Sequence, residues 1–96
     1  MSVTVTPEAA ARILQAFDDS EQEEPLLRVA GRLEDGQPVF GMGFDERRDQ
    51  DTEFSSEGVV VLVSPPSLDW VQGLTIDFVE LPNGDARFVF VTPSQP

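Results

Sequence analysis

The chain of 96 residues contains no cysteine and no histidine. Without thiols it can form no disulfide, no thiolate nucleophile and no thiolate-held metal site. Without imidazoles it has neither a histidine ligand nor a histidine general base. Any metal or acid–base chemistry would therefore have to use oxygen groups, chiefly carboxylates.

Positive charge and long apolar runs are also scarce. Six arginines, with no lysine, stand against 18 acidic residues, and the net charge is −12. This charge repels phosphate backbones and anionic membranes, so we expect no nucleic acid and no membrane as partner. The longest strictly apolar run has five residues, whereas a membrane-crossing helix needs roughly 20. The N-terminal stretch lacks a basic region followed by an apolar one, which predicts no secretory signal and a cytoplasmic protein.

What the chain does contain is enough for one small core. Its hydrophobic fraction is 40% and it has seven phenylalanines, a composition that excludes a largely disordered chain. A chain of 96 residues suits one domain and is too short for two. We therefore expect a single domain over residues 1–93, followed by a tail at 94–96.

The stretch 58–80 organises the rest of the chain. Residues 59–63 are a β-branched and leucine run of strand length, which predicts a strand covered on both faces. The two prolines after it cannot continue a ladder, so they predict a short helix over 65–71 with Ser64 as its cap. Gly73 ends this helix, and the alternation over 75–81 predicts a second strand.

The remaining elements alternate in the same way. Residues 2–5 form a short strand, and Thr6 caps a helix over 7–17 that begins with Pro7 and carries an apolar stripe. Further strands are predicted at 26–33, 39–44, 52–54 and 87–91. The fold class is α+β: a flattened sandwich of two small mixed, mostly antiparallel sheets, with one long and one short helix. The predicted core consists of Val5, Ile13, Leu14, Phe17, Leu27, Val29, Met42, Phe44, Val61, Val63, Leu68, Ile76, Phe78, Phe88 and Phe90.

Three local features allow more than one interpretation. In the strand 39–44 the glycines Gly41 and Gly43 share one face, which we expect to pack within the chain; a bulge or a second subunit is the alternative. Trp70 is expected in the core, with an interface anchor as the alternative. The acidic run 18–24 is expected to be a solvated loop, because its spacing lacks the calcium-loop pattern.

A pattern of acidic, glycine, serine and apolar residues runs through the stretch 57–79: Glu57, Gly58, Val59, Val61, Val63, Ser67, Leu68, Gly73, Ile76, Asp77 and Val79. This pattern resembles the second half of the HesB-like, or A-type iron–sulfur carrier, family, and the opening VTVTPEAAARIL resembles the family's first strand and helix. The resemblance covers nearly the whole chain and implies the HesB-like fold.

Carriers of this family hold their cluster with one cysteine in a GCSG turn and two more in a C-terminal CGC, because iron–sulfur clusters need soft thiolate ligands. Here the turn reads LEDGQP over 33–38, and no cysteine follows Pro93. The resemblance therefore implies no cofactor and no metal ligand. It is closer to a cysteine-less branch typified by the DsrR proteins, which are encoded beside dissimilatory sulfite reductase, through the stretches 30–32, 35–36, 42–45, 56–59 and 77–81.

The main functional hypothesis is a non-catalytic accessory or regulatory protein on a carrier scaffold without cysteines. It would bind an unidentified protein partner of sulfur metabolism or iron–sulfur assembly, as a monomer or weak homo-oligomer. By their place in the family's fold, the candidate partner-binding residues are Arg32, Glu34, Asp35 and Gln37, together with the chain end.

Two alternatives use carboxylates. The first is an iron or divalent-cation site of an iron–sulfur cluster assembly protein. The second is an enzyme with Asp69 and Asp77 as acid and base, although a cap and an outward-facing strand residue explain these two better. The candidate cation ligands are Glu34 and Asp35 in the turn, or Asp45, Glu46, Asp49 and Asp51.

Overall fold

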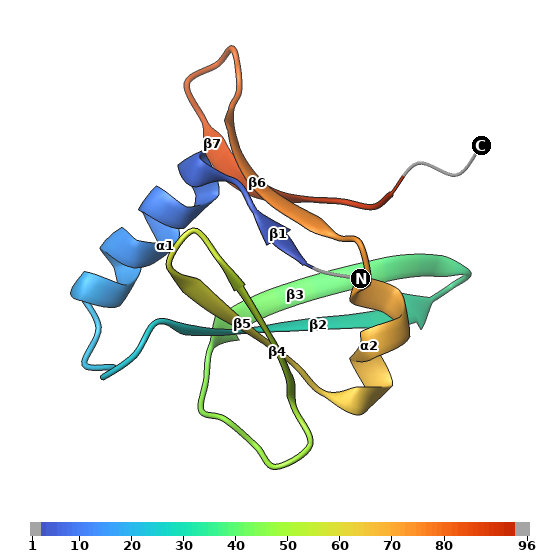
Figure 1. Cartoon of the computed structure of the whole chain (residues 1–96). Coiled ribbons are helices and arrows are strands. Elements are labelled where there is room, and N and C mark those ends of the chain that lie inside the picture. Colours follow the sequence, from blue (N-terminus) through green and yellow to red (C-terminus); the bar gives the residue numbers. More distant parts are fainter. Residues whose placement is uncertain (1–2, 94–96) are drawn as a thin grey trace.

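The computed structural model describes residues 3–93, so the predicted tail at 94–96 lies outside the described residues (Figure 1). Within that range the two predicted helices and all the predicted strands are present. No helix in it is long and apolar enough to cross a membrane. The elements are β1 (Thr4–Val5), α1 (Pro7–Asp18), β2 (Leu26–Glu34), β3 (Gln37–Phe44), β4 (Thr52–Ser56), β5 (Val59–Val63), α2 (Pro65–Val71), β6 (Thr75–Glu80) and β7 (Ala86–Val91).

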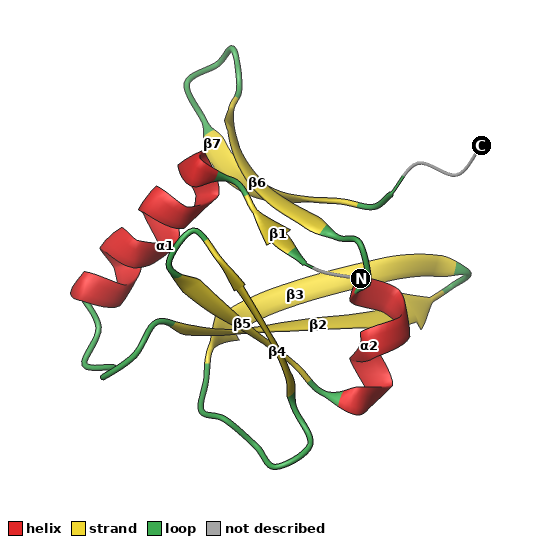
Figure 2. Cartoon of the chain, in the orientation of Figure 1, coloured by secondary structure: helices red, strands yellow, loops and turns green. Residues whose placement is uncertain are grey.

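The strands form two mixed sheets, which confirms the predicted α+β class. One sheet has the order β1-β6-β7 and the other β3-β2-β5-β4. The pairs β1–β6 and β2–β5 are parallel, and the pairs β2–β3, β4–β5 and β6–β7 are antiparallel. Figure 2 shows α1 and α2 at opposite ends of the sheets. The outer strands are therefore β1 and β7 in one sheet, and β3 and β4 in the other.

The start of α1 is fixed to the first sheet by its cap. Thr6 Oγ1 accepts a hydrogen bond from the Ala9 amide at 3.2 Å and donates to Asp77 Oδ1 at 2.8 Å. Asp77 was expected to face outward from β6; instead it is half-buried and holds the cap of a helix 71 residues away in sequence. At α2 Ser64 occupies the N-cap position, as predicted, but its side chain makes no capping hydrogen bond.

The core is built around β5, as its apolar sequence predicts. Val59, Val61, Leu62 and Val63 are fully buried. The predicted core is confirmed for Val5, Ile13, Leu27, Val29, Val61, Val63 and Ile76, and it omitted Val3, Ala9, Ala10, Val59, Leu62, Val71 and Leu74. The other predicted members are only half-buried: Leu14, Phe17, Met42, Phe44, Leu68, Phe78, Phe88 and Phe90.

Several aromatic residues are only half-buried because they lie on the outer strands β3 and β7. Ser56 joins the sheets on the opposite side: its Oγ accepts from the Val5 amide at 2.9 Å and donates to the Val5 carbonyl at 3.2 Å, linking β4 to β1. On the β3 and β7 side, aromatic packing such as the Phe40–Phe90 pair, with ring centroids 5.7 Å apart, joins the sheets. Solvent therefore reaches the aromatic residues from this side.

The glycine face of β3 does not pack within the described chain. A Cβ at Gly41 or Gly43 would meet no atom within 4 Å. The expectation of packing inside the chain is thus wrong, because these residues lie on the outer face of the sheet, opposite Ala30 and Arg28 of β2.

Candidate functional site

The predicted partner-binding residues gather at the tip of the β2–β3 hairpin. Register places Glu34 opposite Gln37, so the connecting turn has two residues, Asp35 and Gly36, with φ of 52° and 79°. Two positive φ values are typical of the turn that matches the twist of paired strands, and glycine adopts one of them without steric cost. All four predicted residues are exposed there.

The charges at the tip form one exposed ion pair. Arg32 Nη2 lies 2.8 Å from Glu34 Oε2, and the two side chains are 74% and 52% exposed. A pair this open to water contributes at most about 1 kcal/mol to stability. Arg32 can therefore exchange Glu34 for a carboxylate of another molecule at little energetic cost.

Apolar side chains surround this charged tip. Leu33, Val39 and Trp70 remain exposed, Trp70 to 39%. The prediction of a core tryptophan is wrong, because α2 lies along β2 with Trp70 at the rim of the contact: its Cβ packs against Gly31, where an added Cβ would lie only 2.8 Å away. A polar tip beside exposed Leu, Val and Trp has the composition that protein interfaces favour.

Two further features adjoin the tip. A hollow of 440 Å³ lies between the hairpin and the start of α2, lined among others by Arg32, Val39 and Pro66. At the other end of α2, Pro93 touches Gly73, where an added Cβ would lie 2.6 Å from Pro93 Cγ. In Figure 1 the β2–β3 turn lies on the same side of the molecule as α2. We call the exposed residues Arg32, Leu33, Glu34, Asp35, Gln37, Val39 and Trp70 the tip surface.

The second group of candidate cation ligands is arranged around an arginine that the sequence did not single out. Arg28 projects from the outer face of β2 and is 13% exposed. Its Nε donates to Asp45 Oδ2 at 2.5 Å, and its Nη1 and Nη2 donate to the two carboxylate oxygens of Asp51 at 2.8 and 2.7 Å. Nη2 also donates to the carbonyl of Glu46 at 2.9 Å. The loop between β3 and β4 is thereby folded over Arg28.

These contacts keep both carboxylates ionised. The hydrogen bonds from Arg28 lower the pKa of Asp51 from 3.8 to about 2, against the opposing effect of its burial. The amide of Glu46 and then the Arg28 guanidinium lower the pKa of Asp45. The same contacts, with Asp51 first, raise the pKa of Arg28. Asp45 and Asp51 therefore neutralise an internal cation and do not face a metal position.

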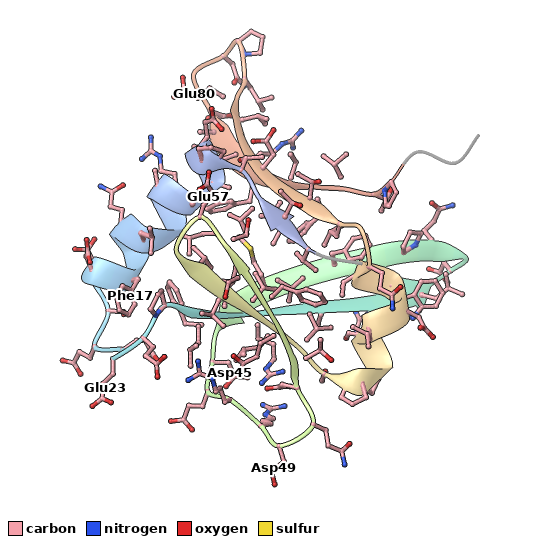
Figure 3. All side chains as sticks on the ribbon, in the orientation of Figure 1. Phe17, Glu23, Asp45, Asp49, Glu57 and Glu80 are labelled. Atoms are coloured by element: carbon pink, nitrogen blue, oxygen red, sulfur yellow. The ribbon has the colours of Figure 1, made fainter. Side chains whose placement is uncertain are left out.

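The other acids do not converge either. Glu46 and Asp49 are exposed, and Figure 3 shows Asp49 at the far end of the loop, away from Asp45. Glu24, from the acidic run, pairs with Arg47 at 3.0 Å. Within residues 3–93 no group of three or more acids is placed to hold a metal ion. The candidate cation ligands of the sequence are thus not brought together by the fold.

Comparison with known proteins identifies the scaffold. The sequence profile of the family described as iron-sulphur cluster biosynthesis matches residues 1–94. The chain belongs to this family. It is 36% identical to the iron-sulfur cluster insertion protein ErpA of Alkalilimnicola ehrlichii over 97 residues, which cover 97% of this chain and 77% of ErpA. It is also 36% identical to an uncharacterized protein SufA of Bacillus subtilis, over 79% of this chain and 65% of that one.

Solved structures agree on the fold. The structure is similar to that of IscA with the [2Fe-2S] cluster, with a TM-score of 0.78 and 22% identity over 95% of this chain and 85% of IscA. It is similar to Escherichia coli SufA with a TM-score of 0.82 and 20% identity over 99% of this chain and 83% of SufA. The predicted HesB-like fold is therefore confirmed. The chain thus belongs to an iron–sulfur biosynthesis family, yet its 96 residues include no cysteine that could supply a thiolate.

Proposed function

We propose that this protein is a non-catalytic accessory or regulatory member of the iron–sulfur biosynthesis family that acts by binding a protein partner through the tip surface. Two observations carry the proposal. The hairpin tip exposes the Arg32–Glu34 ion pair together with the apolar side chains of Leu33 and Val39, and Trp70 of α2 is also exposed. The chain contains no cysteine. The scaffold is that of cluster-handling proteins, whereas the soft ligands that a cluster requires are missing.

The partner belongs, in this proposal, to sulfur metabolism or iron–sulfur assembly, and the protein works in the cytoplasm as a monomer or weak homo-oligomer. Membership in the family supports the assembly system. The resemblance to the cysteine-less DsrR-like branch supports sulfur metabolism, and that branch assignment stays a prediction. An oxygen-ligand cation site finds no support in the fold, because Asp45 and Asp51 are bound to Arg28.

Anaerobic reconstitution tests the first half of the proposal. We expect the protein, incubated with iron and sulfide and then desalted, to remain colourless and free of iron, because it offers no thiolate. Absorbance and metal analysis give the readout. The matched control is the IscA protein above, whose solved structure contains a [2Fe-2S] cluster, treated in parallel. A stoichiometric chromophore in this chain would refute the proposed loss of cluster binding.

Partner capture tests the second half. We expect the double variant Arg32→Gln and Asp35→Asn to capture its partner from an extract of the source cells at least about ten-fold less well, a loss of about 1.4 kcal/mol. Asparagine tolerates the positive φ at position 35, so the turn is retained. The measurement is affinity capture with quantitative mass spectrometry.

The matched control for this variant lies on the other hairpin. The changes Arg87→Gln and Glu80→Gln also remove one exposed charge of each sign, from β7 and β6. We expect this control to capture the partner as well as the parent protein does. The free energy of unfolding of both variants should lie within about 0.5 kcal/mol of the parent's. Equal capture by the tip variant and its control would remove the tip surface from the proposal.

A further inference from the structure

Strand β3 is an outer strand with an unprotected edge. It spans eight residues, QPVFGMGF, and pairs only with β2 among the described strands. Outer strands are normally guarded by charges, prolines, bulges or a covering element. Strand β3 carries no charged residue, and its one proline, Pro38, lies at the turn end, so residues 39–44 have neither guard. A long neutral edge of this kind is a template for pairing with another strand.

The hydrogen-bond pattern shows which backbone groups of β3 face away from β2. The Asp45 amide donates to the Leu26 carbonyl at 3.2 Å, and a two-residue turn follows the pair Glu34–Gln37 at the other end of the hairpin. In an antiparallel ladder every second pair is hydrogen-bonded. Counting from either end, the same residues of β3 bond to β2: those with odd numbers. The amides of Gly41 and Gly43 therefore point to β2. Those that point outward belong to Phe40, Met42 and Phe44.

The position of Pro38 agrees with this alternation. It stands two residues before Phe40, at a position whose nitrogen points away from β2, so its missing N–H removes no bond from the hairpin. We call the outward backbone groups of Phe40, Met42 and Phe44 the β3 edge.

An apolar hollow lies beside the β3 edge on the inner side. Its volume is 150 Å³, and it is lined among others by Ile13 of α1, Met42 and Phe44 of β3, and Phe88 of β7. Side chains of a strand alternate between its two faces, so every second residue of an added strand would point the same way as Met42 and Phe44. Apolar residues at those positions would cover these half-buried side chains and fill the hollow.

Negative charge lies at the Phe44 end of the edge. A second hollow, of 450 Å³, is lined there by polar groups that include Glu21, Glu23 and Glu46. All three are exposed. Strand residues beyond the end of the added ladder would meet this acidic hollow, which favours basic side chains.

We propose that the β3 edge binds an extended segment of a protein partner by strand addition, with alternating apolar residues over Met42 and Phe44 and basic residues over the acidic hollow. Backbone hydrogen bonds supply affinity in this mode and the alternating pockets supply selectivity. This surface is separate from the tip surface, and the inference shares with the proposed function only the idea that the chain binds protein.

A second copy of the chain suits the edge less well. An antiparallel β3–β3 pair would bring the turn of each chain, with Glu34 and Asp35, near the Glu46 end of the other. Each chain also carries a net charge of −12. Like charges would meet at both ends of such a pair, which opposes it.

Amide hydrogen exchange measured by NMR tests the inference residue by residue. The probe is a synthetic peptide as long as β3, with alternating valine and threonine and two arginines at one end, in versions with the arginines first or last. We expect the amides of Phe40, Met42 and Phe44 to exchange freely in the protein alone and at least about ten-fold more slowly with excess peptide. The amides of Gly41 and Gly43 should be protected in both states, because β2 already holds them.

Variants separate the backbone from the side chain. Met42→Pro removes an outward N–H without removing a bond to β2, and Met42→Ala is the matched control that keeps the N–H. We expect the proline variant to lose peptide protection at Phe40 and Phe44 and the alanine variant to retain it.

Charge variants test the acidic hollow. Glu46→Arg should weaken peptide binding several-fold, and Glu80→Arg, on the other sheet, should not. The tip variant Arg32→Gln with Asp35→Asn should bind the peptide like the parent, so failure of the tip proposal and of this one can be told apart.

Three results would overturn the inference. The first is unchanged exchange at the three outward amides in excess peptide. The second is protection by the peptide at Phe88 and Phe90 of β7 in their place. The third is protection of the β3 edge that grows with protein concentration without peptide, which would assign the edge to a second copy of the chain.

Discussion

Replacing Arg28 with methionine should lower the free energy of unfolding by about 2–3 kcal/mol, the largest effect that we expect from any single charge removal in this protein. The change leaves Asp51, whose side chain is only 2% exposed, without the cation that neutralises it. Methionine fills much of the same volume, so the loss reports the hydrogen bonds and charge and not a cavity. Urea unfolding followed by circular dichroism provides the measurement.

The pH dependence identifies the carboxylate responsible. Because the folded pKa of Asp51 is lowered from 3.8 to about 2, its stabilising contribution is complete above the unfolded pKa and is lost as pH falls from about 4 through 2. The stability difference between the parent and Asp51→Asn should therefore be full at pH 6 and vanish toward pH 2. Asp45, whose pKa is also lowered, contributes in the same direction.

The exposed pair Arg32–Glu34 supplies the control for the Arg28 experiment. Arg32→Met removes the same group from the same strand and should change stability by less than about 1 kcal/mol, because its ion pair lies in water. Equal effects of Arg28→Met and Arg32→Met, or a difference between the parent and Asp51→Asn that is independent of pH, would contradict the assigned role of the Arg28 contacts.

Gly31→Val, on the inner face of the sheets, should lower the free energy of unfolding by about 2–3 kcal/mol. An added Cβ would lie 2.8 Å from Trp70 Cβ and 3.1 Å from two ring carbons of Phe40. The Trp70 Cβ is fixed to the backbone of α2, so the helix has to move away from β2. Trp70 is the single tryptophan, and its fluorescence should therefore shift in the folded variant as well as report unfolding.

Gly41→Val is the matched control for this substitution. Gly41 lies on the neighbouring strand opposite Ala30, and a Cβ there meets nothing within 4 Å. Valine suits strands better than glycine, so this variant should be as stable as the parent or slightly more stable. A loss of stability at Gly41 equal to that at Gly31 would show that strand conformation, and not the approach of α2, is what glycine provides at position 31.

Local sequence signals predicted the elements of this fold because each element carries its own boundary chemistry. Thr6 and Pro7 start α1, two prolines start α2, and Asp35-Gly36 closes the hairpin with two positive φ values. The apolar run of β5 required cover on both faces and received it. Strand register and sheet order carry no such local signature, so the placement of Asp77 against Thr6 could not be predicted.

In the candidate site, too, some arrangements could be predicted from the sequence and others could not. The tip residues Arg32, Glu34, Asp35 and Gln37 are close in sequence, and a hairpin brings them together by itself. The acids of the 45–51 loop looked equally suitable as ligands in the sequence. Their true partner, Arg28, lies 17 and 23 residues earlier, on a strand whose outward face became known only with the register.

The sequence by itself therefore determined the secondary structure, the family resemblance and the absence of thiolate chemistry. Composition, helix caps, prolines and turn residues do not depend on how strands pair. The tertiary structure decided which side chains meet: the acids with Arg28, Trp70 with Gly31, and the free edge of β3 with an apolar hollow. Those contacts join residues far apart in the chain. Their cost in chain entropy is met only when the whole sandwich forms, so no short stretch of sequence encodes them.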